Sequence, residues 1–244
     1  RETLLRTLAG SPALRHGDLA TFHEHAREVA PDSSMSILLH DPDGELIMHS
    51  RFPLGTKGLP PAKFSLAMRS HSATENTLVS DVFLAPTVKK HAFAMQIPVQ
   101  YNGKLAYLAL ASVTDQLRPL FGERQLPNGW FASILDRNGM IAARTESNEK
   151  FVGKVVSEEQ KAFLREKRDG FLQFTTLDGV LVIGFISQAS NSGWTFVIGV
   201  PRSQLQQSAI HAVAITCAIA LLLLGAALAI GVFAGRRIAR PIEQ

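Results

Sequence analysis

The sequence predicts an α+β fold with a long N-terminal helix, two tandem lobes built on antiparallel sheets, and one C-terminal transmembrane helix. Three observations predict this fold. Helix-capping residues precede stretches of helical periodicity, one pattern of turns and strands occurs twice, and an uncharged apolar span lies near the C-terminus. The expected parts are a long N-terminal helical region (1–33), a first lobe (34–122), a second lobe (123–202), a juxtamembrane and transmembrane helix (203–235) and the start of a cytoplasmic linker (236–244).

The N-terminal region has the spacing of an amphipathic helix. Leu19, Phe22 and Ala26 recur at intervals of three and four residues, which places them on one face. Asp18 directly precedes this stretch and is a typical N-cap residue. Ser11-Pro12 marks a break in a longer helical region that starts near Arg1.

Each lobe is expected to open with a β-hairpin. Residues 37–47 and residues 132–142 both contain an apolar run, an Asp-x-Asp/Asn-Gly turn and a second apolar run. The aspartate caps such a turn, and glycine supplies the left-handed residue that a tight reversal needs. An EF-hand interpretation of the first turn is disfavoured, because the remaining ligands of a calcium loop are missing.

The later part of each lobe repeats a second set of signals. A second hairpin surrounds Asn102-Gly103 in the first lobe and Asn191-Ser192-Gly193 in the second. Between the hairpins, Ser157-x-x-Gln160 is a capping box that opens a helix, and its counterpart follows Pro60-Pro61. Each lobe should therefore contain a hairpin, a short helix and three further strands, which together form a five-stranded sheet with helices on one side.

An uncharged span predicts the membrane segment. Residues 212–235 contain no charged side chain, and Arg236, Arg237 and Arg240 follow at once. At ~1.5 Å per residue the span can cross a hydrocarbon core of ~30 Å. Because cationic side chains are retained on the cytoplasmic side, we expect residues 1–208 to be extracytoplasmic and residues 236–244 to be cytoplasmic. A buried core helix of a soluble protein is the disfavoured alternative.

Composition excludes several functional classes. The net charge is +4, but no basic run interleaved with aromatic residues indicates a nucleic-acid partner. The single cysteine, Cys217, lies in the expected membrane span, so the external part has no disulfide framework. His23-Glu24-His25 lacks the spacing of a zinc-protease motif, and no nucleophile elbow or phosphate loop occurs. We therefore expect no metal, no cofactor and no catalytic site here; a membrane-anchored enzyme remains the minor alternative.

Three stretches carry a resemblance to a known family. Residues 11–19, residues 134–139 and residues 192–201 resemble the double-Cache sensor domains of bacterial transmembrane receptors, particularly sensor histidine kinases. The resemblance covers residues 1 to about 207. Residues 236–243 look like the start of a HAMP linker. No stretch matches the Tyr/Arg/Trp/Asp pattern of the amino-acid-binding subgroup, so an amino-acid ligand is not assumed.

The resemblance implies a function. It implies two PAS-like lobes in the periplasm of a bacterial cell, a small-molecule ligand in the membrane-distal first lobe, a homodimer, and a further transmembrane helix upstream of Arg1 in the inner membrane. It also implies a cytoplasmic transmitter domain in the same chain, for which a histidine kinase is our first choice. Chemoreceptor and diguanylate cyclase outputs share this front end, and a non-signalling membrane-anchored binding module is the alternative of a different class.

A ligand site in such a lobe needs a few polar groups that converge on an apolar wall of the concave sheet face. His91, Phe93 and Met95 alternate and therefore share one strand face. The structural alternative is that Arg51 and Asp81 form a surface pair while Phe93 and Met95 lie in the core. The ligand-binding candidates are Arg51, Asp81, His91 and Tyr107 as polar groups and Phe52, Phe83, Phe93 and Met95 as the wall.

The second lobe is expected to be mainly structural. Trp194 follows a turn and begins a strand, as a packing anchor does. Arg144 is taken as the repeat counterpart of the Arg51 region and leaves open a second ligand site.

Overall fold

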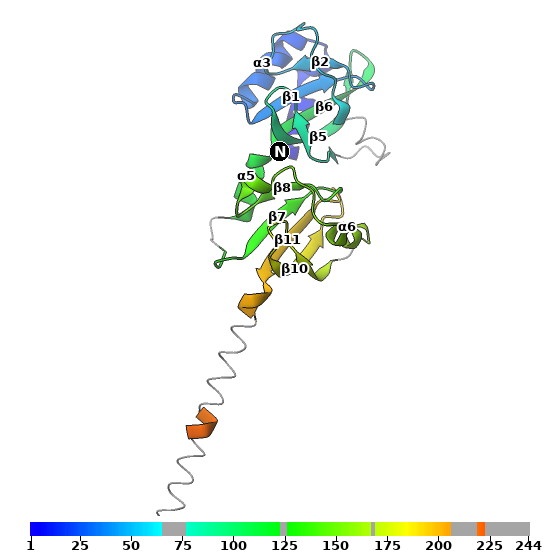
Figure 1. The fold of residues 1–244 in the computed structure, drawn as a ribbon. Helices are drawn as coiled ribbons and strands as arrows, with labels where there is room; N and C mark the ends of the chain where they lie inside the picture. Colours follow the sequence, from blue (N-terminus) through cyan, green and yellow to red (C-terminus); the bar gives the residue numbers. More distant parts are fainter. Residues whose placement is uncertain (65–76, 123–125, 167–168, 206–218, 223–244) are drawn as a thin grey trace, which may run out of the picture. The chain divides into compact units, whose positions relative to one another are not determined.

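The computed structural model describes residues 1–64, 77–122, 126–166, 169–205 and 219–222. The chain divides into one compact unit, Arg1–Gly199, and a second unit, Val200–Gln244. The first unit contains two lobes, each with helices and one antiparallel sheet (Figure 1). The prediction of an α+β fold with two tandem sheets is confirmed.

The N-terminal region is helical, but it forms three helices rather than one long helix. They are α1 (Glu2–Ala9), α2 (Pro12–Arg15) and α3 (Leu19–Val29). The first break occurs at Gly10-Ser11, because proline at position 12 lacks the N–H that a continuing helix would use. The second occurs at Gly17, whose φ of 76° lies in the left-handed region. As expected, Asp18 then caps α3 by accepting the N–H of Thr21.

The first lobe, called lobe 1 below, has a sheet of six strands rather than the expected five. The chain bends away after β3 at residues 80–82 and returns as β4, so the expected third strand is split in two. The strand order is β2-β1-β6-β5-β3, with β4 paired to β5, and a 3-10 helix, η1, follows. The elements are β1 (Met35–His40), β2 (Leu46–His49), β3 (Leu78–Val79), β4 (Phe83–Ala85), β5 (Lys90–Tyr101), β6 (Lys104–Val113) and η1 (Thr114–Phe121).

The second lobe, lobe 2, repeats the same strand order. Its five strands run β8-β7-β11-β10-β9, which matches lobe 1 strand for strand once β3 and β4 are counted together. Ser157 caps α6 as expected, by accepting the N–H of Gln160. The elements are β7 (Phe131–Leu135), β8 (Ile141–Arg144), α5 (Asn148–Phe151), α6 (Glu158–Arg165), β9 (Gly170–Thr175), β10 (Leu181–Gln188) and β11 (Thr195–Pro201).

The turns of the two opening hairpins are closed in the same way. Oδ1 of Asp41 accepts the N–H groups of Asp43 and Glu45, both at 2.9 Å. Oδ1 of Asp136 likewise accepts the N–H groups two and four residues later, at 2.9 and 2.8 Å. The duplicated sequence signal therefore specifies a duplicated backbone geometry, including a register shift at the same point of each hairpin.

Three apolar clusters organise the first unit. In lobe 1, helices α1–α3 cover one face of the sheet, where Leu5 and Phe22 pack with Ile37 and Leu108. In lobe 2, α5 and α6 supply Phe151 and Leu164 to the core. A third cluster joins the two lobes and contains Val82, Phe93, Leu117, Ile134, Ala142, Ala143 and Trp194.

The second unit is described only in part. Residues 202–205 and 219–222 are helical. Within the described residues, no helix combines the length and apolar character needed to cross a bilayer. The remainder of the expected span, 212–218 and 223–235, and the expected linker 236–244 lie outside the described residues.

Candidate functional site

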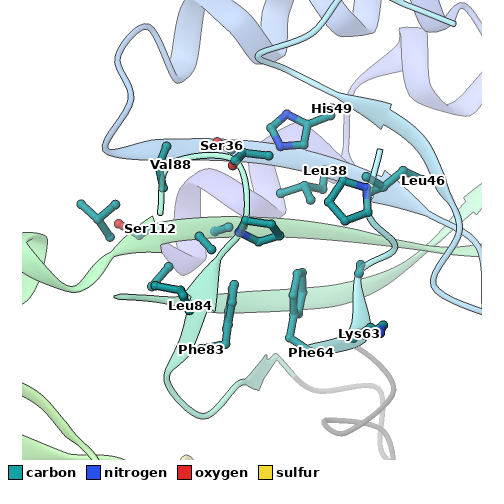
Figure 2. A pocket seen from close by; sticks show the side chains of 18 of the residues that line it. Ser36, Leu38, Leu46, His49, Lys63, Phe64, Phe83, Leu84, Val88 and Ser112 are labelled. Atoms are coloured by element: carbon teal, nitrogen blue, oxygen red, sulfur yellow. The ribbon is translucent and has the colours of Figure 1, made fainter. Parts of the chain in front are cut away.

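A cavity of about 300 Å³ lies on the face of the lobe 1 sheet opposite helices α1–α3. Strands β1, β2, β5 and β6 form its floor, the segment 60–64 forms one side, and the segment 83–88 forms another (Figure 2). Most of the floor is aliphatic or small, which leaves room above the sheet. The lining residues used below are Ser36, Leu38, His49, Phe64, Phe83, Ala111 and Ser112.

Two stacked aromatic rings form part of the cavity wall. Phe64 and Phe83 stack with ring centroids 5.0 Å apart and planes inclined by 13°, and Figure 2 shows them side by side. Phe83 belongs to β4 and Phe64 to the segment after Pro60-Pro61. The stack therefore joins two parts of the chain that are far apart in sequence and gives an apolar ligand a broad surface to contact.

His49, at the end of β2, is the buried titratable group of the cavity. Burial, with the nearby charge of Arg51 and then His23, lowers the pKa of His49 to about 4, so the ring is neutral at physiological pH. Nδ1 accepts the backbone N–H of Arg51 at 3.2 Å. A neutral imidazole that accepts at Nδ1 carries its proton on Nε2, which is then a hydrogen-bond donor. Phe52 packs edge-on against the ring at 4.9 Å and helps to hold it in place.

Two further polar side chains lie on the cavity face of the sheet. Ser112 borders the cavity, but it pairs with Phe93, so its side chain lies on the opposite face. Ser36 lines the floor from β1. Gln96 belongs to the same face, because it and Leu38 both pair with Ala109. It is fully buried, and neither amide atom finds a hydrogen-bond partner among the described residues. Unsatisfied buried groups of this kind are expected where a ligand or water completes the network.

The charges around the cavity are few. None of the described lining residues is acidic, and the lining cation, Lys63, is exposed. The cavity therefore has donors and an apolar wall but, within the described residues, no carboxylate to hold an ammonium group.

The segment from Val79 to Val82 connects the cavity to lobe 2. It lies directly before Phe83, and within the described residues it is held by five hydrogen bonds with three residues of lobe 2. Nε1 of Trp194 donates to the carbonyl oxygen of Ser80 at 3.0 Å, and Oδ2 of Asp136 accepts the N–H of Val82 at 2.9 Å. Arg137 donates from its backbone N–H and from Nε to Oδ1 of Asp81, at 3.3 and 2.8 Å, and from Nη2 to the carbonyl oxygen of Val79 at 3.1 Å.

Asp136 serves two structures at once. One carboxylate oxygen closes the β7–β8 turn, and the other accepts the backbone of lobe 1. Burial raises the pKa of Asp136, while the N–H groups that it accepts oppose this rise. The group is 1% exposed, so loss of its partners would leave a buried carboxylate unsatisfied.

The chain was compared with known proteins. No family model matches it, and no curated protein matches it in sequence. Among solved structures, the extracellular domain of rpHK1S-Z16, described as a histidine kinase, matches with a TM-score of 0.60 at 16% identity over 84% of this chain and 85% of that one. The ligand-binding domain of the Pseudomonas aeruginosa PAO1 amino-acid chemoreceptor PctB, in complex with L-Gln, matches with a TM-score of 0.61 at 16% identity over 88% and 89%. The chain has the double-Cache fold.

A third structure with the double-Cache fold is the sensory domain of the Campylobacter jejuni chemoreceptor Tlp3 with isoleucine bound. It matches with a TM-score of 0.54 at 13% identity over 83% of this chain and 82% of that one. At these identities the likeness concerns the fold.

Of the eight ligand-binding candidates, the structure places Phe83 on the cavity. Phe93 and Met95 lie on the other face of β5, where Phe93 packs edge-on against Trp194 at 5.5 Å. The cavity face of this double-Cache strand is instead formed by Ala92. The three alternating residues do share a face, and it is the face directed toward the core and lobe 2.

The remaining candidates are distributed over three places. Arg51 is exposed and borders a separate polar groove, while Phe52 packs on His49. Asp81 pairs with Arg137 between the lobes, and the His91 ring lies against Gly153 of lobe 2, where a Cβ would collide with it. Tyr107 stacks on His40 at 5.6 Å, on the row of the sheet next to Gln96.

His49 and Ser36 are polar lining residues that sequence reasoning missed, and a signal for His49 was present. The alignment that superimposes Gly44 on Gly139 also places Arg144 on His49, and the sheet register agrees, since His49 pairs with Leu38 as Arg144 pairs with Ser133. The repeat counterpart of Arg144 is therefore His49 rather than the Arg51 region.

Proposed function

We propose that this chain is the extracytoplasmic sensing portion of a bacterial transmembrane receptor and that a small solute binds in the cavity of lobe 1. The observation that carries the proposal is the cavity itself, with its aromatic stack, its buried neutral histidine and the unsatisfied Gln96 on the same face of the sheet. The structural neighbours support it, because two of them were solved with isoleucine or L-Gln bound.

The lining indicates the chemistry of the solute. An apolar body would lie against the Phe64–Phe83 stack, and a hydrogen-bond acceptor such as a carbonyl or carboxylate oxygen would meet Nε2–H of His49. A free amino acid is a poor fit, because its ammonium group would find no acidic side chain among the described lining residues. We therefore favour a small apolar carbonyl compound or monocarboxylate over an amino acid.

Signal transfer from the cavity to lobe 2 would use the Val79–Val82 segment. Phe83 contacts the cavity, and the residues just before it are bonded to Asp136, Arg137 and Trp194. A ligand that displaces Phe83 must move a segment that the described residues of lobe 2 hold by five hydrogen bonds. Such packed interfaces respond by shifting between discrete arrangements.

The receptor assignment extends the sequence predictions. We propose a periplasmic placement for residues 1–208, a transmembrane helix and the start of a HAMP linker after them, and a homodimer whose cytoplasmic transmitter is a histidine kinase. A chemoreceptor is the second candidate, favoured by the chemoreceptor sensory domains among the structural neighbours. A diguanylate cyclase output and a non-signalling anchored module remain alternatives from the sequence.

A thermal-shift screen tests the binding proposal. The 244-residue chain in detergent micelles would be melted with a panel of apolar monocarboxylates, neutral carbonyl compounds and amino acids. A hit should raise the melting temperature of the wild type, and Phe83→Ala should weaken its binding about tenfold, as loss of a buried aromatic contact does.

The matched control is Phe185→Ala, which truncates an aromatic ring that is 40% exposed on lobe 2. It should leave the ligand response intact. If both variants lost ligand affinity equally, or if Phe83→Ala bound the hit normally, the ligand would not bind in the cavity.

A further inference from the structure

In lobe 2, side chains occupy the space that corresponds to the open cavity of lobe 1. By the hairpin register and the sheet pairings, Phe131 corresponds to Ser36, and Gly199 corresponds to Ala111. The Phe131 ring lies directly over Gly199, where an added Cβ would collide with it. Phe174 lies over Gly184 in the same manner. A large ligand is therefore excluded from the lobe 2 sheet face.

A small cavity of about 20 Å³ remains beside these rings. A volume of roughly 10–15 Å³ on this measure holds one water molecule, so the remaining space suits a water or an ion with few atoms. Ser133, Gln160 and Arg144 contribute polar side chains to its lining. Arg144 occupies the position that His49 occupies in lobe 1.

The guanidinium of Arg144 is held rigidly and is poorly neutralised. It is sandwiched between the rings of Phe131 and Phe151, with its central carbon 4.1 and 4.4 Å from the two centroids. The residue is 6% exposed, and its Nε–H has no hydrogen-bond partner among the described residues. The nearest carboxylate, Asp178, is 3.7 Å from a terminal nitrogen and one-third exposed, so water screens its charge.

A buried arginine without a full set of partners is costly, and an anion lowers that cost more than a neutral water does. We propose that lobe 2 binds a small monovalent anion, of the size of chloride or formate, at the Nε edge of the Arg144 guanidinium. This site is separate from the cavity of lobe 1 and does not depend on the sensing function proposed above. Its size follows from the 20 Å³ cavity, and its charge follows from Arg144.

The test compares melting temperatures of the 244-residue chain in sodium chloride, sodium formate and sodium gluconate at equal ionic strength. Gluconate is too large for the cavity and controls for ionic strength. At ten times its dissociation constant, chloride or formate should raise the melting temperature by about 3–5 °C over gluconate. Chloride and formate are scored separately, and a response to either supports the site.

Three variants assign the response to Arg144. Arg144→Met keeps an unbranched side chain between the two rings and should abolish the difference between the salts. Lys154→Met is the matched control, since it removes an exposed cation whose Nζ lies 5.6 Å from the centroid of the same Phe151 ring, and it should keep the difference. Asp178→Asn removes the competing carboxylate without opening the core, so it should bind the anion more tightly. Its melting temperature should reach half of the full rise at an anion concentration about threefold lower than the wild type needs.

Two outcomes would overturn the proposal. If neither the wild type nor Asp178→Asn distinguishes chloride or formate from gluconate, the cavity holds no anion. If a folded Arg144→Met variant responds as the wild type does, the anion binds elsewhere. Should Arg144→Met fail to fold, Asp178→Asn decides alone, because an unchanged or weaker response in it contradicts an anion at Arg144.

Discussion

Transplanting the filled arrangement of lobe 2 into lobe 1 should close the ligand cavity without unfolding the protein. The change is Ser36→Phe with Ala111→Gly, which copies the Phe131–Gly199 pair onto the corresponding positions. Burial of the phenyl group contributes about 1.5–3 kcal/mol, and the glycine in a strand costs about 0.5–1 kcal/mol. The double variant should therefore be more stable than the wild type by about 1–2 kcal/mol.

The single variants provide the internal controls for this prediction. Ser36→Phe alone sets the ring against the Cβ of Ala111, and overpacking of this kind costs about 1–3 kcal/mol. Ala111→Gly alone should lower the free energy of unfolding by the cost of a glycine in a strand, about 0.5–1 kcal/mol, without any compensating burial. The two changes should thus be coupled favourably by about 2.5–6 kcal/mol in a double-mutant cycle, which is the gain of the double variant plus the costs of the two single variants.

The assay is thermal melting with and without the solute found in the screen. At 2–4 °C per kcal/mol for a domain of roughly this size, the double variant should melt about 2–8 °C above the wild type. It should also lose the ligand-dependent shift. A double variant that melts below the wild type would show that the two lobes do not pack equivalently, and a retained ligand shift would place the site outside the cavity.

Three other predictions follow from the site and the sequence. The pKa of His49 falls from 6.5 to about 4 on folding, so the unfolded chain binds the extra proton between these values. The contribution of neutral His49 to the free energy of unfolding should be fully present above pH 6.5 and decrease toward pH 4 by up to about 3 kcal/mol. His49→Gln should remove this pH dependence when unfolding is measured across that range. An unchanged pH dependence in the variant would contradict the assignment to His49. Trp194→Phe keeps one aromatic ring, removes the five-membered ring of the indole and leaves the Ser80 carbonyl without its donor, so it should cost at least about 1–3 kcal/mol in denaturant unfolding. A cost below about 0.5 kcal/mol would mean that water replaces this bond. A reporter that is active only outside the cytoplasm should be active when fused after residue 207 and silent after residue 244, and the reverse pattern would contradict the orientation inferred from the three arginines.

Local turn chemistry was predictable because it depends on a few adjacent residues. The Asp-x-Asp/Asn-Gly signals gave both opening hairpins, and Asn102-Gly103 gave the β5–β6 turn, in which both residues have positive φ. The caps at Asp18 and Ser157 were likewise correct. In each case the side chain bonds to its own neighbouring backbone, so no knowledge of the tertiary structure is needed.

The face of β5 that lines the cavity was not predictable from alternation. Strand β5 is buried along both faces, with helices or lobe 2 on one side and the cavity on the other. The alternation of side chains along a strand therefore separates Phe93 and Met95 from Ala92, but it does not indicate which set faces the cavity. The small side chain of Ala92 was the better indicator of the cavity face, because a cavity forms where side chains leave space.

The helical break at Gly17 and the split between β3 and β4 depend on contacts that the local sequence does not contain. Gly17 packs so closely on Asn102 that a Cβ would collide with it. The β3–β4 interruption exists because Asp136 and Trp194, far along the chain, hold the intervening backbone. Such long-range contacts override local strand propensity.

The contacts that hold the Val79–Val82 segment bear on the engineering of hybrid receptors. Asp136 and Trp194 bind main-chain atoms, the N–H of Val82 and the carbonyl oxygen of Ser80, which every sequence of this backbone path supplies. Arg137 also binds a main-chain atom, the carbonyl oxygen of Val79, so among these hydrogen bonds the ones to the side chain of Asp81 depend on residue identity. A foreign lobe grafted in front of residue 126 would need to reproduce the course of this segment and one compatible charge. It would also need apolar side chains in place of Val82, Phe93 and Leu117, which pack in the cluster that joins the two lobes.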